Sequence, residues 1–473
     1  MKMKIENVIF KALYERSISD PDNVAVCDEN KSFTNQELYA HILKCRTALW
    51  EKSYYRNDII ILKMENCADW VIHFLSLISI GCIVVPVFPE MAESELSKLT
   101  GKLDDEYERY YLLGEAVDYS RVEVTNKLDD LPENDFTAIL HTTSGSTGVP
   151  KLCVRSHMNL YVEGISYVHT LNLTSDDTIV TPLPVYHSYA LGCACMGSMA
   201  AGATLVLMSN YVPRKLLKCV EKQEVTIALV VPSIIKELEN LYLDREYNTS
   251  SLRCFMSGAG ALNEESVNHV KDKYHVDVYS NYGSTETGAL ATGMSNRLPN
   301  SVGVPMYGVE IEIKDANGHV LGVGEKGYIY IKSDASMSGY YADLTQVYDE
   351  NGFFYMGDIG YLDEDSNLFI VGRTKFFINI GGKKLNPKEV EEVILTIDGV
   401  KEVFVHAGHR SDGTEVIVAE LVGSKEITKE FVKSYCKTYL SDYKIPDSIL
   451  FQESIKKNEM GKYIVDREGG DNE

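Results

Sequence analysis

Short apolar runs alternate with amphipathic stretches through most of the chain. Residues 58–64 and 82–86 are rich in apolar residues over strand-like lengths, and residues 66–80 between them repeat apolar positions with helical periodicity. Strands that alternate with helices are typical of a layered α/β fold with a parallel sheet. The same pattern predicts strands at 25–27, 32–34, 137–141, 178–184, 204–208, 227–231, 253–256 and 276–279, and helices at 1–16, 158–167, 193–200 and 213–223.

Local signals mark the ends of several of these elements. Thr34 followed by Glu37 predicts a capping box, because each side chain can satisfy a backbone N–H of the other residue. Ser156 is a second candidate N-cap, and Pro232 is a favoured first residue of a helix. Two or three short elements fit the highly charged residues 90–134.

The pattern changes at Val309, after which strands and turns alternate and predict a small β-rich subdomain. A last α+β unit follows, and we place the boundary before it at Lys375. We therefore expect an N-terminal domain of residues 1–374, with the β-rich subdomain at about 305–374, and a C-terminal domain of residues 375–473. Strands are predicted at 309–313, 320–321, 327–331, 400–406 and 415–421, and helices at 387–397 and 428–440.

Composition restricts the partners and the location. The chain has 473 residues, of which 45% are hydrophobic and 24% charged, as in folded globular proteins. Its formal net charge of −23 disfavours a nucleic-acid-binding surface, so an anionic ligand needs a locally basic site or converging backbone N–H groups. We expect a cytoplasmic protein with no integral membrane segment, because the sequence carries neither a signal peptide nor a membrane-spanning run. The ten scattered cysteines are then expected to be reduced and buried.

The stretch from Thr142 to Lys151 is the strongest candidate for chemistry. Its glycines allow backbone N–H groups to converge on an anion, and Lys151 adds a charge that can reach a phosphate. A polar surface turn uses the same residue types, but hydroxyls at four of the five positions from Thr143 to Thr147 favour phosphate binding. The glycine spacing differs from that of a Walker A loop. The candidate phosphate-binding residues are Thr143, Ser144, Gly145, Ser146, Thr147, Gly148 and Lys151.

A second polar stretch, residues 281–286, follows the predicted strand at 276–279, at the edge where α/β sheets bind ligands. Tyr282 offers a flat face for a purine, Thr285 a hydroxyl for a phosphate oxygen, and Glu286 a hard oxygen ligand for Mg²⁺. An ordinary polar loop after a strand is the alternative. The candidate nucleotide-binding residues here are Asn281, Tyr282, Gly283, Ser284 and Thr285, with Glu286 as the metal ligand.

The two stretches, Ser-Gly-Ser-Thr-Gly-Val-Pro-Lys and Tyr-Gly-Ser-Thr-Glu, resemble motifs of the adenylate-forming (AMP-binding) superfamily, and the chain looks most like its acyl- and aryl-CoA synthetase branch. Six such motifs occur in family order from Thr142 to Lys462. The resemblance implies a large layered α/β domain and a small mobile α+β C-terminal domain. It also implies that the protein uses ATP and Mg²⁺, and that the acyl acceptor is either coenzyme A or a carrier-protein phosphopantetheine. Relative to the family, residues 90–134 look abbreviated.

Further nucleotide contacts are implied by the resemblance. Gly258, Ala259 and Gly260 match the family's adenine-pocket loop, although small residues after a strand are common. Asp358 matches an aspartate that accepts the ribose hydroxyls, and Arg373 matches an arginine near the ribose. A turn aspartate is the alternative for Asp358.

The C-terminal domain carries the remaining matches. Lys375 falls at the family's hinge position, and Gly381 and Gly382 would let a thin pantetheine arm pass close to the backbone. Lys462, near the C-terminus, matches the lysine that bridges the carboxylate and the α-phosphate during adenylation. With His187, Thr285 and Glu286, Lys462 completes the expected catalytic residues.

The carboxylic acid itself is expected beside His187, Tyr189 and Gly283, because residues 182–191 resemble the acyl- and aryl-CoA synthetase motif. Amino-acid-activating domains usually carry an aspartate in this region, and no Asp or Glu lies between Thr178 and Ser209. An unpaired buried ammonium is costly, so a fatty or aryl acid without an α-amino group is favoured. Three alternatives stay open: loading of a carrier protein, activation of an amino acid, and a catalytically silent binding or regulatory protein.

Overall fold

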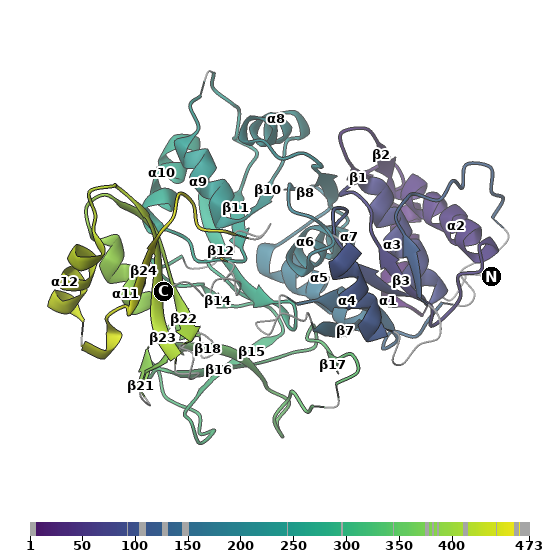
Figure 1. The fold of residues 1–473 in the computed structure, drawn as a ribbon. Coiled ribbons are helices and arrows are strands. Elements are labelled where there is room, and N and C mark those ends of the chain that lie inside the picture. The colour runs from purple at the N-terminus through teal and green to yellow at the C-terminus, as the bar shows by residue number, and fades with distance from the viewer. Residues whose placement is uncertain are drawn as a thin grey trace. The chain divides into compact units, whose positions relative to one another are not determined.

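The computed structural model describes residues 6–91, 93–103, 110–124, 131–143, 151–243, 245–294, 297–343, 345–373, 378–380, 383–385, 387–409, 415–440, 442–457 and 463 (Figure 1). Packing within the chain separates two compact units. The first comprises Met1–Ile311, Ile331–Phe354 and Asp365–Leu368, and the second comprises Glu312–Tyr330, Tyr355–Glu364 and Phe369–Glu473.

A nine-stranded sheet organises the first unit. Its central strands are apolar and buried, as parallel strands covered on both faces must be. All neighbours from β12 to β1 pair in parallel, whereas β2, β13 and β14 extend the sheet as antiparallel edges. The order is β14 (Val304–Pro305), β13 (Gly288–Thr292), β12 (Asp277–Ser284), β11 (Cys254–Gly258), β10 (Ile227–Val230), β8 (Thr178–Thr181), β9 (Thr204–Leu207), β1 (Val24–Cys27) and β2 (Ser32–Thr34).

A six-stranded sheet forms the other half of the first unit. Strands β5, β3, β4 and β6 pair in parallel, and β6, β7 and β17 pair antiparallel. Strands β6 and β7 therefore flank the predicted phosphate loop in the sequence. The order is β17 (Gly339–Tyr340), β7 (Leu152–Ser156), β6 (Thr137–Thr142), β4 (Ile83–Pro86), β3 (Ile59–Leu62) and β5 (Tyr110–Leu113).

Helices α8, α9 and α10 pack on the nine-stranded sheet, and α5, α6 and α7 lie between that sheet and β7 (Figure 1). Several helix starts follow the sequence signals. Thr34 and Glu37 form the predicted capping box of α2, Ser156 caps α5, and Pro232 is the first residue of α9. The helices are α1 (Val8–Ser19), α2 (Asn35–Glu51), α3 (Ala68–Ile80), α4 (Glu93–Leu103), α5 (His157–Leu171), α6 (Ser188–Ala190), the π-helix η2 (Leu191–Met196), α7 (Gly197–Ala201), α8 (Pro213–Gln223), α9 (Pro232–Asn240) and α10 (Glu264–Tyr274).

The β-rich region after Val309 is a four-stranded sheet in the order β15 (Val309–Lys314), β16 (Gly327–Ser333), β18 (Phe354–Leu362) and β19 (Leu368–Arg373). The last part of the chain packs α11 (Pro387–Leu395) and α12 (Lys429–Tyr439) around a buried aliphatic cluster that includes Val403 and Ile417. Its strands are β20 (Ile378–Ile380), β21 (Lys383–Leu385), β22 (Val400–His409), β23 (Glu415–Gly423) and β24 (Ser448–Phe451), with a 3₁₀ turn at Asp442–Lys444.

The predicted α/β class and most predicted elements are confirmed. Two of the alternatives for local structure do not hold: residues 281–284 are not a polar loop, because β12 continues to Ser284, and Asp358 is buried within β18 rather than in a turn. All ten cysteines are free thiols, and only Cys67 and Cys219 are partly exposed. Within the described ranges, no helix combines the length and apolarity needed to cross a bilayer.

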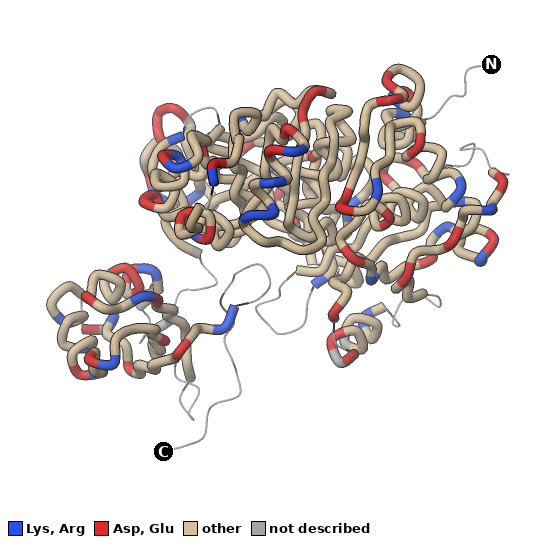
Figure 2. Tube along the Cα trace, turned by 90° about the horizontal axis from the view of Figure 1, so that it is seen from above, with Lys and Arg blue, Asp and Glu red and all other residues tan. Residues whose placement is uncertain are grey.

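Acidic and basic positions are interspersed along the helices and turns of both units (Figure 2). Because acidic residues outnumber basic residues by 69 to 46, a site for a phosphate has to be built from particular cations and donors. The placement of these few groups therefore decides where a nucleotide can bind.

Candidate functional site

Three predicted motifs lie at the carboxyl edge of the nine-stranded sheet, because they are at or just after the carboxyl ends of the parallel strands β8, β11 and β12. Gly258 at the end of β11 pairs with Asn281 of β12, which puts the predicted adenine loop beside the Tyr-Gly-Ser-Thr-Glu motif. Ala259 has φ = 65°, a left-handed conformation that a non-glycine residue seldom adopts without a constraint. The pairing of β11 with β12 therefore makes the two motifs neighbours in the sheet.

Tyr189 packs directly against the predicted adenine loop. Its hydroxyl donates to the carbonyl oxygen of Met256 over 2.8 Å, and a Cβ at Gly258 would lie 2.7 Å from the ring. Glycine is therefore required at this position. Burial raises the pKa of Tyr189 well above its usual range, so the hydroxyl stays protonated and continues to donate.

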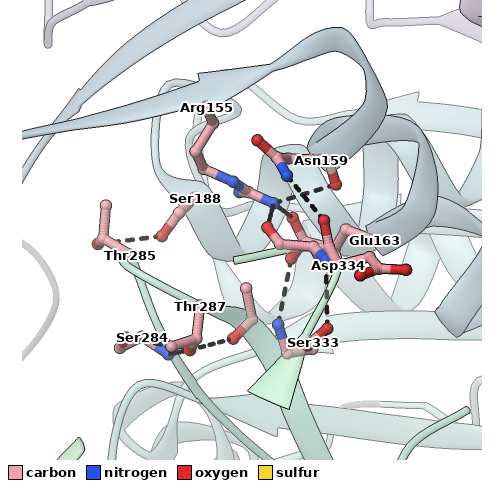
Figure 3. Close-up of polar contacts among 12 residues, drawn as sticks. Arg155, Asn159, Glu163, Ser188, Ser284, Thr285, Thr287, Ser333 and Asp334 are labelled. Atoms are coloured by element: carbon pink, nitrogen blue, oxygen red, sulfur yellow. Dashed lines mark hydrogen bonds and ion pairs between the residues drawn. The ribbon is translucent and has the colours of Figure 1, made fainter. Parts of the chain in front are cut away.

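The β12–β13 turn is held by its own hydroxyls and by helix α6. Ser284 and Thr287 bond to each other, with 3.1 Å between their side-chain oxygens, and Thr285 Oγ1 lies 3.2 Å from Ser188 Oγ (Figure 3). A Cβ at Gly283 would lie 2.2 Å from the carbonyl oxygen of Gly288, so no other residue fits there. The expected catalytic Thr285 is thus fixed next to the residue that follows His187.

Asn281 and Tyr282 are mostly enclosed by protein, with 9% of each residue exposed. The Tyr167 hydroxyl donates to Asn281 Oδ1 over 3.2 Å, which orients the amide. Burial also raises the pKa of Tyr167 well above its usual range and keeps the donor protonated. A nucleotide contact of Asn281 stays a prediction, and the structure adds a role for its amide in fixing β12.

Lys151, the residue immediately before β7, is linked to Glu286 through Tyr340. The Lys151 ammonium lies 4.3 Å from the centre of the Tyr340 ring and 3.3 Å from Asp343 Oδ2. The Tyr340 hydroxyl donates to Glu286 Oε1 over 3.0 Å. These contacts bring the predicted phosphate lysine and the predicted metal ligand into one chain of contacts.

Tyr340, in β17, and Asp343, shortly after it, were not predicted from the sequence, because no contiguous motif links them to Glu286 or Lys151. Burial, followed by the Glu286 carboxylate, raises the pKa of Tyr340 and keeps its hydroxyl protonated. The side-chain hydroxyl of Thr345, then its backbone N–H and Lys151, lower the pKa of Asp343 to about 2, so Asp343 is ionised at neutral pH.

Residues 337–341, here called the linking segment, bond to both sheets of the first unit. The N–H of Met337 donates to the carbonyl oxygen of Glu286 over 2.7 Å. The N–H of Ser338 donates to the carbonyl oxygen of Val154 over 2.8 Å, and β17 then pairs with β7. The position of Glu286 relative to the hairpin is therefore set by main-chain bonds as well as by Tyr340.

The donor set fits a magnesium ion that is shared with a nucleotide. The Tyr340 hydroxyl donates a hydrogen bond to Oε1 of Glu286, whereas Oε2 has no hydrogen-bond partner within the described part of the chain. The described residues contain no group of three or more His, Cys, Asp or Glu that could hold a metal by themselves. Mg²⁺ is typically held by one or two carboxylates together with substrate phosphates, so one glutamate beside a phosphate loop is sufficient.

Several expected site residues cannot be placed. Residues 144–148, Lys375, Gly381, Gly382 and Lys462 lie outside the described residues. The hairpin closes just before the loop, where the N–H of Thr143 donates to the carbonyl oxygen of Lys151 over 2.8 Å. His187 immediately precedes α6, with its ring centroid 5.0 Å from that of Tyr186. Asp358 and Arg373 lie on β18 and β19.

We expect Tyr340→Phe to raise the KM for MgATP about tenfold, with a smaller effect on kcat. The reason is that the hydroxyl orients the Glu286 carboxylate, whereas the ring that faces Lys151 is retained. Steady-state kinetics at varied MgATP concentration measure the effect. Tyr242→Phe, which removes a hydroxyl from a residue that is 80% exposed, is the matched control. Equal KM values for Tyr340→Phe and the wild type would contradict this role.

Comparisons with known proteins identify the family of the chain. The family model of AMP-binding enzymes matches residues 14–107 and 98–341, and the model of the AMP-binding enzyme C-terminal domain matches residues 389–462. Similar curated proteins include 4-coumarate–CoA ligase 3 of Arabidopsis thaliana, 28% identical over 95% of this chain and 88% of the relative. The 2-succinylbenzoate–CoA ligase of Bacillus licheniformis is 28% identical over 96% of this chain and 98% of the relative.

Similar solved structures share the whole fold. ATP-bound MatB from Rhodopseudomonas palustris superimposes with a TM-score of 0.86 at 23% identity and covers 97% of both chains. MenE, the o-succinylbenzoate CoA synthetase from Bacillus subtilis, in complex with its acyl-adenylate intermediate gives a TM-score of 0.80 at 24% identity and covers 96% of both chains.

Proposed function

Because this chain belongs to the family of AMP-binding enzymes, we propose that it adenylates a carboxylic acid with ATP and then transfers the acyl group to the thiol of coenzyme A. The curated relatives are named as CoA ligases for acids of both aryl and fatty type, which supports this reaction class. The observation that carries the proposal is the contact chain from Lys151 through Tyr340 to Glu286.

In the first half-reaction, the carboxylate attacks the α-phosphorus of ATP, so that acyl-AMP forms and pyrophosphate leaves. Lys151 and the residues of the phosphate loop would hold the β- and γ-phosphates. Glu286 would hold Mg²⁺, which supplies positive charge to the phosphates. Lys462 would neutralise the charge that moves from the carboxylate to pyrophosphate.

Tyr282 and residues 258–260 would form the adenine site, and Asp358 and Arg373 would bind the ribose. These roles follow from the family's motifs and from the neighbouring positions of β11 and β12. The acid would lie beside His187, Tyr189 and Gly283, with its carboxylate near His187, and Thr285 would contact a phosphate oxygen. The Thr285 hydroxyl contacts Ser188, the residue after His187, which supports placing the phosphate contact next to the acid.

In the second half-reaction, a thiol displaces AMP and forms the thioester. The C-terminal domain would rotate about Lys375, so that Gly381 and Gly382 replace Lys462 at the active site. A carrier-protein phosphopantetheine stays the alternative acceptor, because the motifs serve either thiol. The cytoplasmic location stays a prediction.

Pyrophosphate release across a panel of carboxylic and amino acids, with and without coenzyme A, tests the proposal. We expect release with aryl or fatty acids and little release with α-amino acids, because an unpaired buried ammonium is costly. CoA-dependent formation of a thioester separates coenzyme A from a carrier protein as acceptor. Robust pyrophosphate exchange with free α-amino acids alone would overturn the assignment, and no release with any acid would favour a silent binding protein.

A further inference from the structure

A buried ion pair lies next to the β12–β13 turn, here called the catalytic turn because it carries the expected catalytic Thr285. Arg155 on β7 and Glu163 on α5 are joined by a contact of 2.6 Å between Nη2 and Oε2, and their side chains are 0% and 2% exposed (Figure 3). The Arg155 guanidinium also donates to the carbonyl oxygen of Ala335 over 3.0 Å. Glu163 Oε1 accepts from the N–H of Ala289, at the start of β13, over 3.3 Å. The pair therefore connects β7 and α5 to the strand that leaves the catalytic turn.

Two glycines make room for the Glu163 carboxylate. A Cβ at Gly192 would lie 2.1 Å from Oε1, and a Cβ at Gly288 would lie 2.8 Å from the carboxyl carbon. The carboxylate is therefore set between the backbones of η2 and β13. Ser188, which contacts Thr285, is four residues before Gly192 in the same run of helix. Four residues of helix correspond to about 6 Å along the axis, so the Glu163 carboxylate contacts this run of helix about one turn beyond Ser188.

Unsatisfied buried polar atoms accompany the carboxylate. Within the described residues, Arg155 Nε and Nη1 and both ring nitrogens of His141 are buried and have no hydrogen-bond partner. His141 pairs with Cys153 across the β6–β7 hairpin, and Arg155 is two residues from Cys153, so both side chains lie on the same face. Burial, followed by the charge of Arg155, holds the pKa of His141 well below its usual range, so the ring is neutral. The unsatisfied guanidinium N–H groups and the charged acceptor Glu163 thus lie together about one turn of helix beyond Ser188.

We propose that Glu163 and Arg155 recognise a hydroxyl group at the distal end of the acid and so make this enzyme selective for short or single-ring hydroxylated acids. The inference rests on the proposed function and specifies the substrate of the same site. A hydroxyl donates one hydrogen bond and accepts two, so it can donate to Glu163 while it accepts from an unsatisfied N–H of Arg155. Unpaired buried donors of this kind are costly until a ligand or a water molecule bonds to them.

Other distal groups fit this pair less well. A hydrocarbon end would leave the guanidinium N–H groups unsatisfied and bring no compensating bond. A second carboxylate would face Glu163, and an ammonium would face Arg155, so each would meet a like charge. Long fatty acids are excluded as well, because the ion pair occupies the space about 6 Å beyond the catalytic turn.

Matched pairs of acids that differ only by a hydroxyl in place of a methyl group test the inference. The pairs are 4-hydroxybenzoate with 4-methylbenzoate, and 5-hydroxypentanoate with hexanoate. The measurement is the ratio of kcat/KM for pyrophosphate release within each pair. In the wild type, we expect at least one pair to favour the hydroxylated acid by about tenfold or more, as a hydrogen bond to a charged group predicts. A ratio near one or below one in both pairs would overturn the inference.

The variant Arg155→Leu/Glu163→Leu removes both charges together, because loss of only one partner would leave a buried unpaired charge and destabilise the fold. We expect the double variant to lose the preference or to favour the methylated acid. The matched control is Arg253→Leu/Asp177→Leu, which removes the 2.7 Å ion pair at the amino ends of β11 and β8, the sheet edge opposite the site. An unchanged ratio in the first variant, or the same change in the control, would contradict the proposal.

Binding provides a readout that does not depend on turnover. If no acid in the panel releases pyrophosphate, the proposed function fails, whereas a ratio near one in an active enzyme refutes only the inference. When no acid releases pyrophosphate, the acid-dependent rise in melting temperature, measured with ATP present, compares the members of each pair directly. A larger rise with the hydroxylated acid supports the inference, and an equal rise or no rise overturns it.

Discussion

Replacing Lys462 with alanine is expected to slow acyl-AMP formation about a hundredfold or more, whereas thioester formation from supplied acyl-AMP changes much less. The reason is that a bridging cation stabilises charge only while it moves from the carboxylate to pyrophosphate. Once acyl-AMP has formed, the thiol displaces AMP without that movement of charge. Single-turnover assays of the two half-reactions measure the two effects separately.

Lys457→Ala is the matched control for this prediction. Lys457 is also a lysine near the C-terminus, and it pairs with Glu402 while its ammonium lies 4.8 Å from the centre of the Tyr463 ring. Loss of that surface pair is expected to leave both half-reactions within about a factor of three of the wild type. Equal losses in both half-reactions of Lys462→Ala would show that the residue supports the structure rather than adenylation.

Glu286→Gln is expected to slow adenylation by two to three orders of magnitude, on the order of what loss of one transition-state contact costs. An amide oxygen can still accept the hydrogen bond of Tyr340, so the local geometry is preserved. The substitution removes the negative charge that we propose holds Mg²⁺. The concentration of Mg²⁺ required for half-maximal rate should therefore rise as the maximal rate falls, and a magnesium titration at fixed ATP measures both.

Glu221→Gln controls for the general loss of a carboxylate. Glu221 pairs with Arg245 on the surface of α8, with 2.6 Å between Oε2 and Nη2, and its loss should leave the magnesium dependence unchanged. A Glu286→Gln enzyme with the wild-type magnesium dependence would refute the assignment of Glu286 as the metal ligand, whatever its rate.

Most elements of the fold were predictable because their signals are local. The capping box of Thr34 and Glu37, the proline that starts α8 and the apolar strand β10 are each encoded within a few residues. The extension of β12 to Ser284 was not, because Asn-Tyr-Gly-Ser has weak strand preference and is held by pairing with β13. The π-helical segment η2 was likewise missed, since it depends on close packing around Gly192.

The candidate site was predictable where a motif is contiguous. The motif carrying Thr285 and Glu286 could be found in this way. Tyr340 could not, because it lies 54 positions from the glutamate that it contacts and only the pairing of β17 with β7 brings it there. Glu163 was not predicted for a similar reason. The region where an amino-acid-activating domain would carry its aspartate is residues 178–209, whereas Glu163 lies on α5, outside that range, and reaches Ala289 only in the fold.

The linking segment couples the free energy of nucleotide binding to the stability of the contact between the two sheets. Lys151 belongs to one sheet and Glu286 to the other, and residues 337–341 bond to both. A nucleotide that contacts both residues binds only while the sheets are joined. At a hundred times its Kd, such a ligand adds about 2.7 kcal/mol to the stability of the joined state. Cellular ATP would therefore act as a folding ligand for this enzyme as well as its substrate, and depletion of ATP would expose the chain to proteolysis between its sheets.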